Sequence, residues 1–513
     1  MTANKRIALN VIATYGRSLY QIALGLFTAR WALSALGNVD FGLFGLVGGL
    51  IGFVTFLNTL LAVSTSRFFA YNVGSQLIAG NEKAGLLECQ KWFTIAVLIH
   101  FFLGCVLVLI GYPIGACCVQ KFLVIPSDRM AACLVVWRAT CTMAFFGMVN
   151  VPFQAMFTAK QEIAEMTLYS LITTTGNAIF LYYAASHPGD WLGRYAISVA
   201  AFSVLPMVLV CARAIAVFPE CRFLRLRVAD YSRVRLMVGY SSSQFLADFA
   251  GIVGAQGVSI VVNRFLGPAF NAAMSIGNNV ADKAATLGMA MVGAFHPAIV
   301  NAAGAHDYER MRALSYQSCK FSCAVVLFFA IPLILEVDEV MVLWLMSPPK
   351  GAAILCSFAL ASFIVNRSTS GLSSAIEALG RIAAFKFIMA IAGSLPFLLA
   401  LLLLSCGFGI IAVGFAGLVT VICFSLIRVY YAQKLAGVSV SHWIRKVLIP
   451  VAIMSICSVV IAFLPRYILS ASVVRIVITT VLAWIVLAPL VWIMLFDAAD
   501  KDFILTRIRR CCG

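Results

Sequence analysis

Apolar runs of about 20 residues recur from one end of the chain to the other, separated by short segments rich in Gly, Pro and charged residues. An α-helix of about 20 apolar residues crosses the hydrocarbon core of a bilayer, so each run predicts a transmembrane helix. The pattern predicts about fourteen such helices and a polytopic membrane protein of the all-α class. They are expected at 8–35, 41–73, 88–114, 130–158, 166–186, 193–214, 237–264, 270–297, 313–335, 351–376, 384–405, 410–433, 447–464 and 472–496.

Two halves of this pattern resemble each other. Leu36-Gly37, followed by Phe41, resembles Leu266-Gly267, followed by Phe270, and two further segment pairs repeat at a similar offset. Weak internal symmetry of this kind is typical of transporters built from two lobes. It predicts two pseudo-symmetric lobes of six helices each, plus two C-terminal helices, around a central cavity. The expected boundaries are 1–214 for the N-terminal lobe, 215–236 for a basic linker, 237–433 for the C-terminal lobe, and 434–513 for the last two helices and a basic tail.

Composition and charge agree with a membrane protein. Of the 513 residues, 62% are hydrophobic and only 11% are charged, whereas a soluble domain carries roughly 25% charged residues. The net charge of +17 comes from Lys and Arg that gather in every second loop, including Arg213 to Arg235 and Arg428 to Lys446. The positive-inside rule therefore places these loops and both termini in the cytoplasm. The basic residues do not interleave with aromatics on a soluble platform, which excludes a nucleic-acid-binding protein.

The motifs of several chemistries are missing from the sequence. Sixteen cysteines lie mostly alone in apolar runs, without CxxC spacing, which disfavours a zinc or redox site. No Walker A motif, HExxH motif or defensible catalytic triad is present. We therefore expect a protein that is not an enzyme and that has no metal or cofactor.

Cations lie within several predicted spans or close to their ends. An ionisable group at bilayer depth costs a few kcal/mol even on insertion scales, so it normally faces a partner or a water-filled cavity. One interpretation is a cationic cavity that attracts anions such as diphosphates, which the planar guanidinium group binds with two hydrogen bonds. The alternative is that long side chains near helix ends reach the headgroups. The cations in question are Arg17, Arg67, Arg138, Arg264, Lys283 and Arg367.

Further polar residues gather in the predicted helical hairpin at Ser241–Pro297. Acids at this depth are candidates for coupling transport to H⁺ or Na⁺, and amides there are candidates for hydrogen bonds to sugar hydroxyls. Hydrogen bonds between helices explain such amides equally well, and Asp282 has the alternative of neutralising Lys283. The residues of this coupling or polar cavity are Asp248, Asp282, Gln244, Gln256 and Asn278.

With these residues in place, nearly the whole chain resembles the multidrug/oligosaccharidyl-lipid/polysaccharide (MOP) exporter superfamily, and within it the Wzx-type O-antigen and polysaccharide flippases. The resemblance rests on five segments taken together: LGNVDFGLFGLVGGLIGFVTFLN (36–58), VIPSDRMAA (124–132), NVPFQAMFTAKQE (150–162), GAQGVSIVVNRFLGPAFNAA (254–273) and ERMRALSYQSCKFS (309–322).

This resemblance implies a function and a place in the cell. It implies a flippase of the bacterial inner membrane that moves polyprenyl-diphosphate-linked oligosaccharide from the cytoplasmic to the periplasmic leaflet by alternating access. The product would supply O-antigen, capsule or exopolysaccharide biosynthesis, with a polysaccharide polymerase and glycosyltransferases as partners. The resemblance also implies cationic substrate contacts at Arg17, Arg67 and Lys283. One departure is Met274, where many relatives carry Arg, so Lys283 or Arg264 would have to supply that contact.

Two other functions remain open. The first is a cation-coupled multidrug antiporter of the same superfamily, which needs acids and aromatics facing its cargo, whereas the charges in these spans are mostly basic. The second is a membrane enzyme such as a polysaccharide polymerase or ligase, which needs a large extracytoplasmic loop, whereas the predicted outward loops are short.

Overall fold

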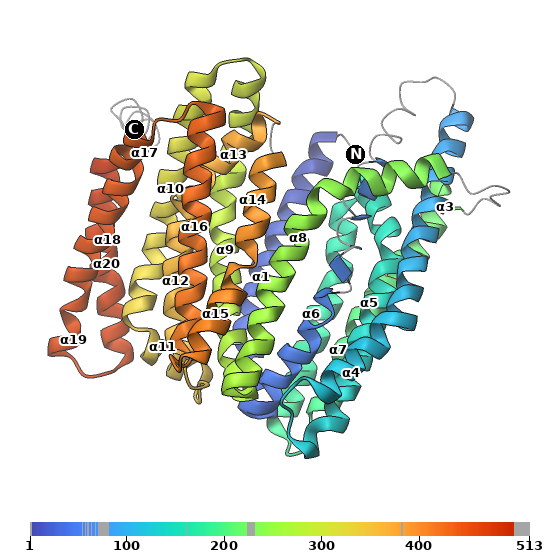
Figure 1. Ribbon diagram of the computed structural model, residues 1–513, viewed down its shortest axis with the longest axis horizontal. Coiled ribbons are helices and arrows are strands. Elements are labelled where there is room, and N and C mark those ends of the chain that lie inside the picture. Colours follow the sequence, from blue (N-terminus) through green and yellow to red (C-terminus); the bar gives the residue numbers. More distant parts are fainter. Residues whose placement is uncertain are drawn as a thin grey trace. The chain divides into compact units, whose positions relative to one another are not determined.

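The structure is a computed structural model of Met1–Gly513 (Figure 1). It describes the backbone of residues 3–53, 55–56, 58, 61–62, 64–66, 68–69, 82–160, 162–222, 231–380 and 383–496. Within these ranges it describes all side chains except those of residues 3–15, 82–84, 231, 238–248, 284–291 and 294. Every regular element in the described part of the chain is a helix, which confirms the predicted all-α membrane fold.

Internal packing divides the chain into two compact units, Met1–Ala272 and Ala273–Gly513. The N-terminal unit contains α1 (Ala3–Gly49), α3 (Glu82–Val106), the π-helix η1 (Leu107–Gly111), α4 (Tyr112–Lys121), η2 (Ser127–Arg129), α5 (Met130–Ala159), α6 (Ile163–Ser186), α7 (Leu192–Val217), η3 (Pro219–Cys221) and α8 (Tyr231–Leu266).

The C-terminal unit begins inside α9 (Pro268–Gly304). It continues through α10 (Tyr308–Leu335), α11 (Val337–Leu345), α12 (Ala352–Arg367), α13 (Ser370–Ala378), α14 (Ala383–Gly393), α15 (Leu395–Ser405), α16 (Ile411–Ala436), α17 (Val440–Trp443), the π-helix η4 (Ile444–Leu448), α18 (Ile449–Phe463), α19 (Pro465–Ile468) and α20 (Val473–Met494).

Two glycines at matching positions of the internal repeat end a helical segment in each half. Gly37 interrupts α1 with a φ of 71°, and Gly267 separates α8 from α9 with a φ of 90°. Only glycine adopts this left-handed conformation without a steric penalty. Both Leu-Gly pairs of the predicted repeat therefore have the same structural role, because each changes the direction of the chain between consecutive helical segments.

In the N-terminal unit, α5 packs along α7, and α1 packs along α6. Trp137 of α5 is buried with Leu43 and Leu46 of α1, and its indole Nε1 donates to the Tyr112 carbonyl at 3.0 Å. The segment after α7 is fixed to the same unit, because buried Glu220 accepts a hydrogen bond from Lys160 at 2.5 Å. This part of the predicted basic linker therefore has specific partners.

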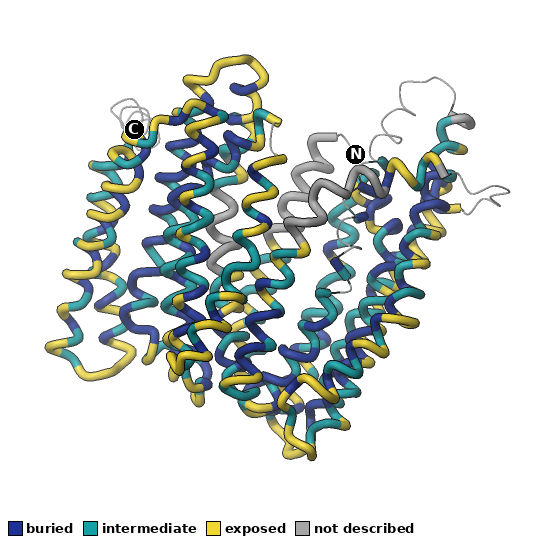
Figure 2. Tube along the Cα trace, in the orientation of Figure 1, coloured by how far each residue is buried: buried dark blue, intermediate teal, exposed yellow. Residues whose placement is uncertain are grey.

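In the C-terminal unit, α10 is the central helix. The most apolar window of α10 is 67% buried, against 17% for that of α20, which lies beside α18 at the edge of the unit. Figure 2 shows this contrast as long dark-blue stretches on α10 and many exposed positions on α18 and α20. The last two long helices are thus attached to a core formed by α10, α12, α13 and α16.

The helix positions agree closely with the predicted spans, as at α5 (predicted 130–158), α6 (166–186) and α16 (410–433). Among described residues, ten helices are long and apolar enough to cross a membrane, or eleven if the bent pair α12 and α13 counts as one span. The predicted number of fourteen stays a prediction, and so do the predicted lobe boundaries.

Candidate functional site

A broken helix lies at the centre of the candidate site in the C-terminal unit. The axis bends by 44° between α12 and α13, at Ser368 and Thr369. In a membrane such a break is tolerated only where other groups satisfy the freed backbone. Trp443 Nε1 donates to the Ser368 carbonyl at 2.9 Å, and Ser425 Oγ donates to the Val365 carbonyl at 3.4 Å.

Arg428 of α16 reaches across to this break. Its Nη1 donates to Asn366 Oδ1 at 2.6 Å, to Thr369 Oγ1 at 3.3 Å and to the Asn366 carbonyl at 3.5 Å. Its Nε is buried and has no hydrogen-bond partner in the described part of the chain. All the acceptors of Arg428 are neutral, so its positive charge is not cancelled by an ion pair.

Arg367 lies beside Arg428 at the end of α12. Its guanidinium carbon is 4.6 Å from the ring centroid of Phe363, and its buried Nε likewise has no partner among the described residues. Both arginines line a cavity of about 430 Å³ together with His296 of α9. The remaining lining residues are Val292, Gly293, Pro297, Asn366, Ser370 and Ser373.

The cavity has the electrostatics of an anion site. Among the described residues, its lining contains two guanidinium groups, one imidazole and no carboxylate. The carboxylate of nearby Glu377 is held by Lys386 at 2.9 Å. Ser370 and Ser373 belong to the first turn of α13, where the backbone carries a partial positive charge. Guanidinium forks, hydroxyls and a helix N-terminus together suit a phosphate or diphosphate group.

Four of the residues predicted for a cationic cavity belong to the N-terminal unit, and three of them are described there. Arg17 is half-buried on α1, with a buried Nε that has no partner in the described residues. Arg138 is exposed on α5 and donates to Tyr112 Oη at 3.3 Å. Arg264 is exposed near the end of α8. Arg67 lies outside the described residues.

The polar residues predicted for coupling differ in their surroundings. Gln256 packs against α1, where a Cβ added at Gly49 would lie 2.4 Å from its Oε1, so it joins two helices. The side chains of Gln244 and Asp248 lie outside the described residues. In the C-terminal unit, Asp282 and Asn278 are exposed. The predicted cation Lys283, next to Asp282, is half-buried. Among the predicted cations that the structure describes, Arg367 alone lines the cavity.

Sequence reasoning missed Arg428, which was assigned to a cytoplasmic loop, and also His296. Arg428 lies well inside α16, eight residues before its end at Ala436. A signal for this was present, since the apolar pattern continues beyond it through Val429 and Tyr431, both of which are buried. Arg428 was therefore counted with the cytoplasmic loop residues, although the predicted span 410–433 already contained it.

The N-terminal unit contains a second buried polar group that the sequence did not single out. His100 of α3 is fully buried. Its Nδ1 lies 2.6 Å from Asn58 Oδ1, and its Nε2 lies 3.3 Å from Thr65 Oγ1. Both ring nitrogens are satisfied by neutral partners, so the arrangement suits a neutral imidazole that joins α3 to Asn58 and Thr65.

No protein-family model matches the sequence, and no curated protein matches it. Several solved structures do resemble the fold. An inward-facing MATE family multidrug resistance transporter of the MOP superfamily gives a TM-score of 0.65 at 15% identity, over 82% of this chain and 96% of that one.

The lipid II flippase MurJ, in an inward closed conformation, also gives a TM-score of 0.65, at 12% identity over 97% of this chain and all of the other. The MATE multidrug transporter DinF-BH, in complex with R6G, gives 0.56 at 12% identity, over 86% and 98% of the two chains. These neighbours are transporters and a flippase rather than enzymes. At such low identity the likeness establishes the fold alone, which is the helical membrane fold that these neighbours share.

Proposed function

We propose that this protein is a flippase that moves polyprenyl-diphosphate-linked oligosaccharide from the cytoplasmic to the periplasmic leaflet of a bacterial inner membrane. The observation that carries the proposal is the pair Arg367 and Arg428, two cations in one cavity whose lining contains no carboxylate. Buried like charges repel each other, and Arg428 is held beside Arg367, while the acid that acts on Arg428, Glu377, is itself paired with Lys386. An anionic headgroup in the cavity would supply the missing charge.

The groups around the cavity give each part of such a headgroup a contact. The guanidinium groups of Arg367 and Arg428 line the cavity and bind phosphate oxygens. In the first turn of α13, Ser373 adds a hydroxyl group to the lining, and the Ser370 hydroxyl donates to the Arg367 carbonyl at 3.0 Å. The bend between α12 and α13 brings these donors to one place. Discontinuous helices form substrate sites of this kind in many transporters.

A multidrug antiporter is the competing function, and the fold resembles MATE transporters and MurJ equally well. The chemistry of the cavity favours the flippase, because an organic cation would meet two arginines rather than an acid. The two functions therefore differ in the sign of the charge that the site accepts.

The test uses the purified full chain in proteoliposomes that contain a fluorescent polyprenyl-diphosphate-linked N-acetylglucosamine. Flipping is followed as the access of an impermeant quencher to the label. Arg428→Gln should slow flipping by about tenfold or more, because it removes charge-assisted hydrogen bonds. The matched control is Lys434→Gln on the same helix, whose ammonium is exposed and lies over Tyr430.

A second variant keeps the test decisive if Arg428→Gln fails to fold. Arg367→Gln removes the other charge without removing a hydrogen bond to the backbone of the bend, since the guanidinium contacts the Phe363 ring. Unchanged flipping in both variants would refute the proposal. Transport of a lipophilic cation such as tetraphenylphosphonium, with no flipping of the labelled lipid, would favour the antiporter.

The coupling ion is part of the same proposal. If Asp248 or Asp282 carries H⁺ or Na⁺, flipping in proteoliposomes should accelerate when a gradient of that ion is imposed and return to the basal rate when an ionophore collapses it. Rates that do not depend on either gradient would exclude both acids from coupling. In this function glycosyltransferases would build the cargo before transport, and a polysaccharide polymerase would use it afterwards.

A further inference from the structure

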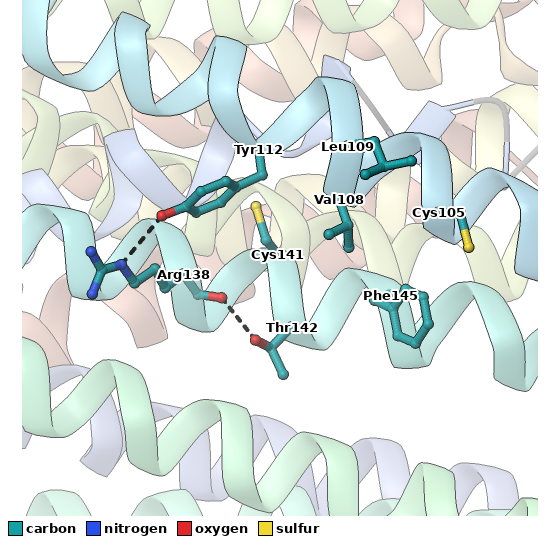
Figure 3. Close-up of a pocket in the computed structure, with 8 residues that line it drawn as sticks. All are labelled: Cys105, Val108, Leu109, Tyr112, Arg138, Cys141, Thr142 and Phe145. Atoms are coloured by element: carbon teal, nitrogen blue, oxygen red, sulfur yellow. Dashed lines mark hydrogen bonds between the residues drawn. The ribbon is translucent and has the colours of Figure 1, made fainter.

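The N-terminal unit carries a groove with a cavity volume of about 590 Å³, unrelated to the arginine pair described above. One stripe of residues from each of two neighbouring helical segments forms its walls. Figure 3 shows these residues on the two segments, with the hydrogen bond between Tyr112 and Arg138 at one end. From the segment that runs through α3, η1 and α4 come Cys105, Val108, Leu109 and Tyr112, and from α5 come Arg138, Cys141, Thr142 and Phe145.

Both stripes have the spacing of one helix face, i, i+3, i+4 and i+7. Because the two segments run in opposite directions, Tyr112 and Arg138 mark one end of the groove and Cys105 and Phe145 mark the other (Figure 3). Seven residues of helix rise through about 10 Å. The groove is therefore a short channel with its polar groups at one end and apolar or weakly polar walls along the rest.

The π-helix η1 (Leu107–Gly111) forms part of one wall. Its wider turn changes which side chains face α5, and such turns occur often at functional sites. Gly111 ends the π-helix, and Pro113 follows in the first turn of α4. The backbone therefore departs from regular α-helical geometry beside the groove.

The surface around the groove is apolar and exposed within candidate membrane spans. Leu109 is 74% exposed and Phe102 is 66% exposed, so these side chains contact acyl chains in a bilayer. Exposed neighbours on the same segment include Phe101, Ile110 and Ile114. A groove set in such a surface is filled by lipid rather than by water.

Arg138 gives the groove its chemistry. It lies eight residues after the start of α5, about 12 Å along the helix, so its head is within reach of the interface. Among the described residues, its guanidinium makes one hydrogen bond, from Nε to Tyr112 Oη at 3.3 Å. In the part of the chain that the structure describes, no carboxylate forms an ion pair with it. The remaining guanidinium donors point away from the apolar end (Figure 3).

We infer that this groove binds an anionic phospholipid of the bilayer, with the phosphate on Arg138 and Tyr112 and one acyl chain along the groove toward Cys105 and Phe145. Charge decides the class of occupant, because an unpaired guanidinium at the head of an apolar channel complements an anionic headgroup with an apolar tail. The short length and the single cation favour an ordinary phospholipid over a polyprenyl diphosphate, which carries more charge and a much longer tail.

The experiment measures binding of phosphatidylglycerol to the full chain by native mass spectrometry, with phosphatidylcholine as the neutral comparison. Arg138→Met keeps a long apolar side chain and should weaken phosphatidylglycerol binding at the tightest site by about tenfold or more. The matched control is Arg194→Met, since Arg194 is also exposed near the start of a helix but lies over the Trp191 ring, outside the groove.

A second pair of variants tests the channel itself without altering its charge. Thr142→Trp should fill the groove and also weaken phosphatidylglycerol binding, whereas Ile179→Trp, at a 65% exposed position on α6, should leave it unchanged. Equal binding of both lipids, or undiminished binding in both Arg138→Met and Thr142→Trp, would overturn the inference. Displacement of phosphatidylglycerol by an equimolar amount of undecaprenyl diphosphate would overturn the choice of occupant.

Discussion

Replacement of Glu336 should weaken the attachment of the last two long helices, α18 and α20, to the rest of the C-terminal unit. Glu336 lies between α10 and α11, and its side chain is fully buried. Its Oε2 accepts hydrogen bonds from Arg475 Nε at 3.1 Å and Nη2 at 2.8 Å, and its Oε1 accepts one from Thr479 at 2.9 Å. Arg475 and Thr479 both belong to α20, so one carboxylate joins α20 to α10.

The magnitude follows from what Glu336→Ala leaves behind. Removing one member of a buried ion pair costs about 3–5 kcal/mol, because the other charge stays buried without compensation. Arg475 keeps a weaker contact with Glu339 at 3.4 Å, and Glu339 is partly exposed. We therefore expect a loss of about 3 kcal/mol in the free energy of unfolding, or roughly 150-fold in the equilibrium constant.

The assay is SDS-titrated unfolding in mixed micelles, followed by tryptophan fluorescence. Trp484 of α20 donates to the Phe328 carbonyl at 2.7 Å, so it reports the same contact between helices. The double variant Glu336→Leu with Arg475→Met removes both charges and should lie within about 1 kcal/mol of the parent protein. The control is Arg213→Ala, which breaks a partly exposed pair with Glu165 and should cost less than about 1 kcal/mol.

Two results would refute this reasoning. A loss below about 1 kcal/mol in Glu336→Ala would mean that the buried carboxylate is not a major contact of α20. A double variant as unstable as Glu336→Ala would mean that the loss comes from packing rather than from an uncompensated charge.

Two further predictions follow from the same charge distribution. Arg17→Ala and Lys283→Ala should each abolish flipping of the labelled lipid in proteoliposomes while the protein still inserts, and normal flipping would remove that residue from the substrate path. A cysteine introduced at Ser232, in a chain freed of its other cysteines except Cys221, should resist an impermeant maleimide on intact cells and react after permeabilisation. Cys221 should stay unlabelled under both conditions, because burial raises the pKa of its thiol to about 12 and removes the reactive thiolate. Labelling of the introduced cysteine on intact cells would reverse the proposed orientation.

The sequence was sufficient for features that arise from local pattern. The long apolar runs predicted α5, α6 and α16 to within a few residues, because the bilayer demands about 20 apolar residues in a helix. The Leu-Gly pairs of the internal repeat predicted turns at Gly37 and Gly267, because only glycine adopts the required φ readily. These predictions needed no knowledge of which helices pack together.

Features that depend on partners distant in the chain could not be predicted in the same way. Arg428 meets Asn366, 62 residues away, and Glu336 meets Arg475, 139 residues away. The predicted spans 410–433 and 472–496 contain Arg428 and Arg475, but neither was singled out as a site residue, because the sequence offered no partner that would hold such a group within a helix bundle. Hydropathy registers the cost of burying a charge, whereas the compensation for that cost becomes visible only when the helices are assembled.

The distribution of paired and unpaired charges gives the strongest link between fold and function. Acids of the described residues are largely held by cations near helix ends, in the pairs Glu88–Arg233, Glu220–Lys160, Glu165–Arg213, Glu336–Arg475, Glu377–Lys386 and Asp40–Arg129. With 37 basic and 20 acidic residues, this pairing leaves a surplus of cations.

Part of that surplus lies inside the helices. Arg367 and Arg428 share a cavity without an acid, and Arg138 heads an apolar groove. An arginine at bilayer depth costs about 2.5–3.5 kcal/mol on insertion scales, so three of them together cost more than many single contacts return. Neutral acceptors such as Asn366 and Tyr112 offset only part of this cost. Anions from outside the chain are the compensation that remains: a transported diphosphate for the cavity, and a phospholipid headgroup for the groove.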